Sequence, residues 1–177
     1  MMTAGLQVST PTDTTIRFTR VFRAPRHLVW NAMTKPDLVQ RWMFCPPDWS
    51  WGKCEMDVRV GGKFRWEWNG PNGQTALSIW GEYREVQPHS RIVHTERMEM
   101  GPGAGGACGG ATAADTGATP EPWELLAALE LGEQNGSTVM TMTLTFASKA
   151  ARDGALASGM EHGMEAGYAQ LDAQLAQ

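Results

Sequence analysis

The stretch SKAARDGALASGMEHGMEAGYAQLDAQLAQ, residues 148–177, decides how the rest of the chain folds. Its large apolar residues recur at every third or fourth position: Leu156, Met160, Met164, Tyr168, Leu171 and Leu175. This is the period of a helix with one apolar stripe. At about 1.5 Å of rise per residue the helix would be roughly 40 Å long. We therefore expect one long C-terminal helix that buries its stripe against the remainder of the chain.

Glycines inside this stretch indicate that the helix depends on its surroundings. Each interior glycine costs ~1 kcal/mol of helix propensity relative to alanine, so packing must hold the helix in place. Gly159, Gly163 and Gly167 recur every four residues and form a narrow strip beside the apolar stripe. The strip has two interpretations, which the sequence leaves open: tight packing on a sheet, or one wall of a cavity.

Composition limits the classes of protein. The 177 residues suit one domain with a real core. The net charge of -4 offers no basic surface to nucleic acid. The chain holds 8 Trp and 11 Met, which supply large, adaptable apolar surface for a core or for an apolar pocket.

The cysteines and the apolar runs bear on compartment and cofactors. Cys45, Cys54 and Cys108 are an odd set without a secretory leader, which predicts reduced thiols and a cytoplasmic location. No His or Cys spacing is typical of a metal site, and we expect neither a metal nor a cofactor. No apolar run approaches the ~20 residues of a membrane span.

The remaining segments predict an α+β domain over residues 14–177, preceded by a disordered tail of residues 1–13. A strand at 14–23 is followed by two short helices that begin near Pro25 and Pro36. Turn signals then separate six alternating segments, at residues 54–60, 63–69, 75–87, 91–100, 121–133 and 139–146. Residues 101–119 are rich in Gly and Ala and predict a flexible insertion. The economical architecture is a curved antiparallel sheet of about seven strands, in the order β-α-α-β6-α, wrapped around the long helix.

Four segments resemble a known family. Residues 22–32 (FRAPRHLVWNA) are similar to the opening of the SRPBCC, or START-like, superfamily. Residues 34–42 (TKPDLVQRW), 57–64 (DVRVGGKF) and 167–175 (GYAQLDAQL) resemble the branch homologous to the activator of the heat-shock-protein ATPase. The chain departs from that branch at Tyr168, where Trp is usual, and in its longer insertion.

The resemblance implies a helix-grip fold around a central cavity. It does not imply one activity, because members bind lipids and other apolar ligands, cyclise polyketides or assist a chaperone. It also supplies no universal set of catalytic residues, so the catalytic residues stay unknown and the candidate site must come from the residues themselves.

One strand carries the best candidates for chemistry. His94 and Glu96 share a strand face with Ile92 and Met98. A buried His–Glu pair would serve as an acid/base couple or as polar anchors for a ligand. The alternative is that the opposite face of the strand points inward. His162 is offset from the apolar stripe and is expected to face solvent.

The leading hypothesis is a protein that binds a small apolar or aromatic ligand between the sheet and the final helix. One alternative is an enzyme of the cyclase, dehydratase or hydrolase type that acts in the same cavity. The other is a co-chaperone-like module with a protein partner, either monomeric or homodimeric. The expected ligand-binding residues are Trp66, Trp68, His94, Glu96, Met142, Met160, Met164 and Tyr168.

Overall fold

The computed structural model describes residues 5–104 and 123–177. All its strands join one antiparallel sheet in the order β1-β2-β8-β7-β6-β5-β4-β3. The strands are β1 (Gln7–Ser9), β2 (Thr15–Phe22), β3 (Ser50–Met56), β4 (Lys63–Asn69), β5 (Thr75–Gln87), β6 (Arg91–Met100), β7 (Trp123–Gln134) and β8 (Ser137–Phe146). The helices are α1 (Arg26–Thr34), α2 (Pro36–Trp42), α3 (Lys149–Ala157) and α4 (Met160–Leu175), with a 3-10 turn η1 (Pro102–Ala104).

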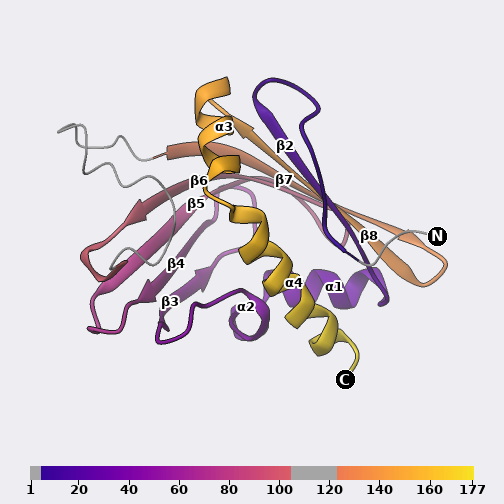
Figure 1. Cartoon of the computed structure of the whole chain (residues 1–177). Coiled ribbons are helices and arrows are strands. Elements are labelled where there is room, and N and C mark those ends of the chain that lie inside the picture. Colours follow the sequence, from indigo (N-terminus) through magenta and orange to yellow (C-terminus); the bar gives the residue numbers. More distant parts are fainter. Residues whose placement is uncertain (1–4, 105–122) are drawn as a thin grey trace.

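The sheet is strongly curved, and the helices lie on its concave side, with α4 crossing the sheet diagonally (Figure 1). The predicted α+β helix-grip architecture is confirmed. Hairpins follow the expected turn chemistry. Asn135 and Gly136 both have positive φ between β7 and β8, as a two-residue hairpin turn requires.

The C-terminal helix is two helices, so the prediction of one long helix is wrong. Ser148 caps α3 by accepting a hydrogen bond from the Ala151 backbone N–H, and α3 ends at Ala157. Gly159 then adopts φ +71° and α4 begins at Met160. Glycine reaches the left-handed region without a steric penalty. The break lets the two helices follow the curved sheet in different directions (Figure 1).

Two glycines of the strip, Gly163 and Gly167, face the segment that ends α2 rather than the sheet. A Cβ atom on Gly167 would lie 3.2 Å from the Phe44 backbone nitrogen and 3.3 Å from the Trp42 carbonyl oxygen. A Cβ atom on Gly163 would lie 3.6 Å from the Phe44 ring. Close approach of a backbone, one use expected of the strip, is therefore found at Gly167. The partner is the segment that ends α2.

The core divides into two clusters. The larger one joins α1, α2 and α4 to the sheet through residues that include Phe22, Trp42, Met140 and Tyr168. The smaller one lies beneath α3, and its members are Ile16, Phe18, Ala127, Leu144, Phe146 and Ala155. Both clusters draw on β2, β8 and β7, which is the side of the sheet that the C-terminal helices cover.

The N-terminal segment is more ordered than predicted. Residues 7–9 form β1, which pairs with β2 in the register Gln7 to Thr19. The Leu6 backbone N–H donates to Glu165 Oε2 at 2.8 Å. The prediction of a disordered tail is wrong for these residues because β1 gains backbone partners on β2 and brings Leu6 to a carboxylate on α4. The strand makes eight where about seven were expected.

Two further boundaries differ from prediction. β3 ends at Met56, because residues 57–62 form a turn with Gly62 N–H donating to the Arg59 carbonyl. Most of the predicted flexible insertion lies outside the described residues. Its first four residues, 101–104, pack against the β4–β5 turn, where Gly101 N–H donates to the Ala76 carbonyl at 2.8 Å.

Candidate functional site

The candidate site is on the concave face of the sheet. Alternation places every second residue of a strand on this face. The register pairs Trp66 with Ile79, Ile79 with Met98 and Trp68 with Leu77. His94 and Glu96 share that face of β6. Four of the predicted residues, Trp66, Trp68, His94 and Glu96, therefore lie on one continuous surface formed by β4, β5 and β6.

His94 and Glu96 form the predicted pair. His94 Nε2 lies 3.2 Å from Glu96 Oε2, and the imidazole is buried. Phe64 and Tyr83 hold the ring edge-on, with centroid distances of 4.9 Å and 5.9 Å. The interpretation in which the opposite face of β6 points inward is therefore wrong for His94.

Tyr168 is a core residue through which α4 packs against α2 and β2. Its ring stacks on Trp42 at 5.7 Å and meets Phe22 edge-on at 5.8 Å. Burial raises the pKa of Tyr168 well above its ordinary value; the Arg20 charge opposes that shift and the Glu96 charge adds to it. Tyr168 thus stays neutral and positions the helix.

The three predicted methionines lie on the side of the sheet that α3 and α4 cover. Met142 on β8 and Met164 on α4 pack against both core clusters, whereas Met160 packs only against the smaller one. Met142 and Met164 therefore lie where the two core clusters meet. Met160 is separated from the tryptophans, because it lies over the cluster beneath α3.

Sequence reasoning missed one residue of the same surface, Trp51, and one buried polar residue of α4, Glu161. Trp51 pairs with Trp68 across β3 and β4, and their rings lie 4.6 Å apart. Glu161 is in the first turn of α4, seven residues before Tyr168 and so on the same side of the helix. The heptad spacing between Glu161 and Tyr168 was available in the sequence as a signal.

Several buried polar atoms of this surface have no hydrogen-bond partner. A buried unpaired donor or acceptor costs ~1–3 kcal/mol, so each one needs an explanation. Within the described residues these atoms are Arg20 Nε, Trp51 Nε1, Trp66 Nε1, Trp68 Nε1, His94 Nδ1, Glu161 Oε2 and Gln174 Oε1. Five of the seven are on the tryptophans, His94 and Glu161.

Arg20 is a charged residue on the β2 side of the concave face. Its side chain is buried and donates to Glu165 at 2.7 Å and to Asp172 at 2.5 Å. Burial alone would lower the pKa of Arg20, but the two carboxylates reverse this and raise it. Both carboxylates come from α4, so the cluster fastens the helix to β2.

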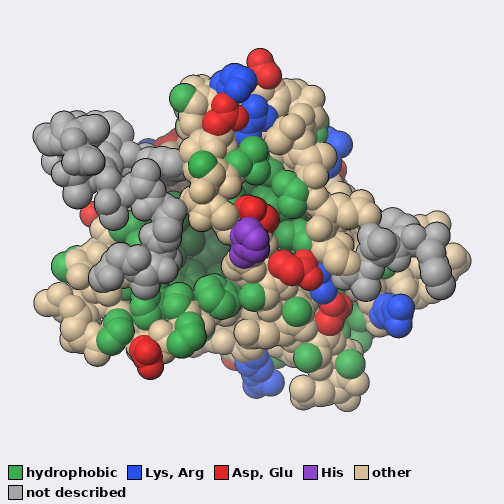
Figure 2. Space-filling view, in the orientation of Figure 1, with side chains coloured by type: hydrophobic (Ala, Val, Ile, Leu, Met, Phe, Trp, Pro, Cys, Tyr) green, Lys and Arg blue, Asp and Glu red, His purple; other side chains and the backbone are tan. Residues whose placement is uncertain are grey.

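The concave face also has an open region, which we define by Trp66, Leu77, Ile79, Met98 and Met100. Met98 and Met100 are 40% and 43% exposed although they share the inner face of β6. Trp66, Leu77 and Ile79 are only partly buried. Figure 2 shows hydrophobic side chains gathered in a hollow beside the C-terminal helices, over the β3–β6 side of the sheet.

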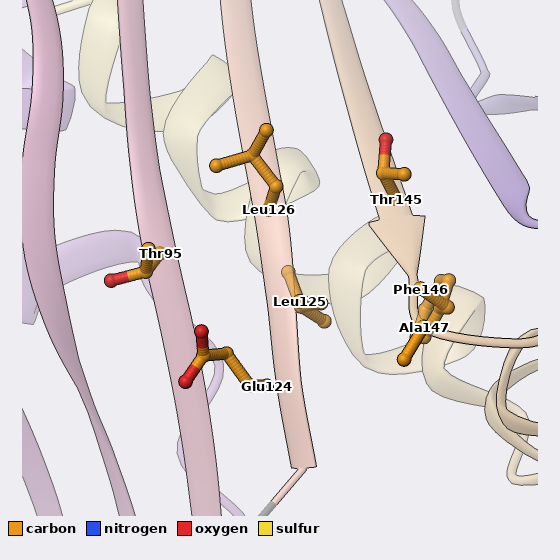
Figure 3. Close-up of a pocket in the computed structure, with 7 residues that line it drawn as sticks. All are labelled: Thr95, Glu124, Leu125, Leu126, Thr145, Phe146 and Ala147. Carbon is orange, nitrogen blue, oxygen red and sulfur yellow. The ribbon is translucent and has the colours of Figure 1, made fainter.

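A second, shallower depression is on the opposite face of the sheet. Figure 3 shows Thr95, Leu126 and Thr145 there, with the helices behind the strands. It is wide open to solvent, and its polar groups neither converge nor pair with a buried acid or base. We therefore place the candidate site on the concave face.

The thiols and possible metal ligands do not add chemistry to the site. Burial raises the pKa of Cys54 to about 11, which keeps the thiol protonated, and its Sγ lies 3.7 Å from the Pro36 carbonyl oxygen. Over residues 5–104 and 123–177, no three His, Cys, Asp or Glu side chains gather as a metal site would require. Among the helices of the same residues, none is both long and apolar enough to cross a bilayer.

A curved antiparallel sheet closed by a C-terminal helix, with an aromatic inner face, defines a helix-grip protein of the START-like class. The family model that matches the chain is that of the Activator of Hsp90 ATPase homolog 1-like protein, over residues 23–176. The chain belongs to this family. No curated protein matches the sequence.

Solved structures agree with that assignment. A Rhodobacter sphaeroides protein is 30% identical, with a TM-score of 0.79, and the match covers 97% of this chain and 98% of that chain. A Nitrosomonas europaea protein is 24% identical with a TM-score of 0.72, covering 95% and 97% of the two chains. A Mycobacterium smegmatis protein is 22% identical with a TM-score of 0.74, covering 96% and 95%. The last two show the fold alone.

Proposed function

We propose that the protein binds a small apolar or aromatic molecule between the sheet and its C-terminal helices. The observation that carries the proposal is the open region. Met98 and Met100 face the concave side of the sheet yet remain about two-fifths exposed, while Met140 on the same face is fully buried. Large apolar side chains grouped in a hollow are typical of a ligand site.

Burial of this surface would supply the binding free energy. Removing apolar surface from water contributes about 25 cal/mol per Å², so a ligand that covers several of these side chains gains several kcal/mol before its entropic costs. Phe64 is buried beside Trp66, and Tyr83 is buried beside Phe64. They supply a rigid base, which limits the ordering cost of binding.

The test is a thermal-shift screen of uncharged aromatic and apolar compounds. A ligand at 100 times its Kd adds about 2.7 kcal/mol of stability, which raises the Tm by roughly 5–10 °C for a chain of this size. Trp66→Ala should abolish most of that rise. Trp80→Ala is the matched control, because Trp80 is on β5 next to Trp66's strand but carries Arg65 over its ring on the other face.

If Trp80→Ala reduces the rise as much as Trp66→Ala does, the ligand is not on the concave face. If no compound raises the Tm of the wild-type protein, ligand binding is wrong. The protein-interaction role that the family description suggests would then be favoured.

A second candidate function is acid–base catalysis in the same site, and the His94–Glu96 pair favours it. A histidine that donates Nε2–H to a carboxylate keeps Nδ1 free to accept a proton, and His94 Nδ1 is buried without a partner in the described residues. The test is chromatography of a bound ligand after incubation with wild type and with His94→Gln. Catalysis predicts conversion by the wild type and a loss of ~10²–10⁴-fold in the variant. Recovery of the ligand unchanged from the wild type would exclude catalysis on that ligand.

A further inference from the structure

Three tryptophans on the concave face have indole N–H groups that are buried without an acceptor among the described residues: Trp51, Trp66 and Trp68. They are neighbours. Trp51 is directly opposite Trp68 in the sheet, and Trp66 is two residues from Trp68 on the same face of β4. An indole nitrogen only donates, so an acceptor is the one partner that satisfies it.

Trp42 shows how a core tryptophan of this chain is normally accommodated. Its Nε1–H donates to the Ala32 carbonyl at 2.8 Å, and the ring packs against Tyr168. Buried donors without partners are few in native proteins. Three of them at adjacent positions, beside the open region, indicate a place where an acceptor from outside the chain binds.

The charges around the tryptophans restrict what that acceptor is. The concave positions of β3 to β6, within the described residues, hold no Lys or Arg; the basic side chains Lys53 and Arg65 are at the alternate positions. The acidic group on the concave face of β6 is Glu96, which pairs with His94. An anionic ligand would find no Lys or Arg there and would be repelled by the Glu96 carboxylate.

We propose that the ligand is an uncharged aromatic carbonyl compound whose oxygen accepts hydrogen bonds from the indole N–H groups of Trp66 and Trp68. This inference rests on the proposed ligand-binding function and names its chemical class. The aromatic body lies in the open region, and the carbonyl oxygen is directed toward β4.

The test compares three naphthalenes of similar shape. 2-Acetylnaphthalene carries the carbonyl, 2-isopropenylnaphthalene replaces the oxygen with CH2, and 2-naphthoate carries a negative charge. We expect 2-acetylnaphthalene to bind roughly 5- to 100-fold more tightly than 2-isopropenylnaphthalene, since two hydrogen bonds separate them. The naphthoate should bind more weakly than both. Isothermal titration calorimetry measures the three Kd values.

Two further measurements locate the hydrogen bond. In protein labelled with ¹⁵N-tryptophan, the Trp66 and Trp68 indole N–H signals should move downfield with 2-acetylnaphthalene only, while the Trp42 signal stays in place. Trp66→Phe keeps a ring but removes one of the two donors, so it should bring the Kd for the ketone closer to that of the alkene. Trp80→Phe, on the outer face, should leave both Kd values unchanged.

The possible outcomes distinguish the carbonyl inference from the proposed ligand-binding function. Equal Kd values for the ketone and the alkene overturn the carbonyl inference and leave apolar binding intact. A tighter Kd for the naphthoate overturns it as well. Failure of all three naphthalenes to bind, together with failure of the wider screen, overturns both.

Discussion

The two sides of the concave face use the same residue types in opposite ways. On β2 and β8, Phe18, Phe22 and Met140 are fully buried, and the buried guanidinium of Arg20 has two carboxylate partners on α4. On β4 and β6, Trp66 and Met98 remain partly exposed, and several buried polar atoms lack partners. One side is a completed core that holds the helices. The other is a preformed surface that the described residues leave uncovered.

The difference arises from where the C-terminal helices run. α3 and α4 cross the sheet over β2, β8 and β7 and then pass toward α1 and α2 (Figure 1). They cannot also cover the outer ends of β4 to β6. In a curved sheet, a helix that closes one side leaves the other to be filled by large side chains or by a ligand.

The largest expected effect comes from one methionine substitution on each side. Met140→Ala should lower the free energy of unfolding by ~2–5 kcal/mol, because it leaves a void in a closed core. Met98→Ala removes the same atoms from a partly exposed position and should change stability by only about 0.5 kcal/mol. Urea denaturation measures both. Similar large losses from the two variants would mean that the open region is packed core.

The next comparison is between two glycines one helical turn apart on α4. Gly167→Ala should destabilise the protein by ~1–3 kcal/mol, because its Cβ would press on the backbone of Trp42 and Phe44. Gly163→Ala meets only the Phe44 ring at an ordinary distance and should stabilise the helix by about 0.5–1 kcal/mol. Thermal unfolding of both variants measures the difference. Equal effects would contradict the close contact between α4 and the end of α2.

The smallest expected effect is a loss of folding stability at alkaline pH. It involves the only two tyrosines of the chain, Tyr83 and Tyr168. Burial raises the pKa of both, and at Tyr83 the charges of Cys54 and Asp57 add to the shift. Their stabilising contribution is complete below the unfolded pKa of about 10 and declines above it. Above that pH the unfolded chain releases protons that the folded chain keeps, so each tyrosine costs up to about 1.4 kcal/mol per pH unit.

The absorbance of tyrosinate at alkaline pH measures tyrosine ionisation directly. The free energies of unfolding of Tyr83→Phe and Tyr168→Phe then show which tyrosine causes the loss of stability. Each variant should have a shallower decline of stability above pH 10 than the wild type. Ionisation of Tyr83 at its ordinary pKa in the folded protein would show that water reaches the β5 side of the core, and the boundary of the open region would move to include it.

Much of the fold and part of the site could be predicted because they depend on short-range periodicity. The period of two in residues 91–100 placed His94 and Glu96 on one face, and the structure pairs them. The same alternation put Trp66 and Trp68 together. Trp51 was missed because its position depends on the pairing of β3 with β4, where the register shifts between Trp51 and Lys53, so simple alternation does not carry from Cys54 back to Trp51.

The break at Gly159 also could not be predicted from the sequence. The apolar stripe continues from Leu156 to Met160 with helical spacing, so periodicity alone predicts one helix. A glycine in that position can remain helical or adopt a positive φ, and the curvature of the sheet beneath it selects between the two. Likewise, the glycine strip indicated a close contact without naming its partner.

The sequence by itself determined the family and most of the order of the elements from β2 to β8, because these follow from local alternation, turn residues and short motifs within a few tens of residues. Only the tertiary structure decided which apolar side chains became core and which stayed open. That choice depends on the path of α3 and α4 across the sheet. Whether a side chain is buried depends on what lies opposite it. Met98 and Met140 both stand in an alternating segment with a second Met two residues further on, yet Met140 is buried and Met98 is exposed.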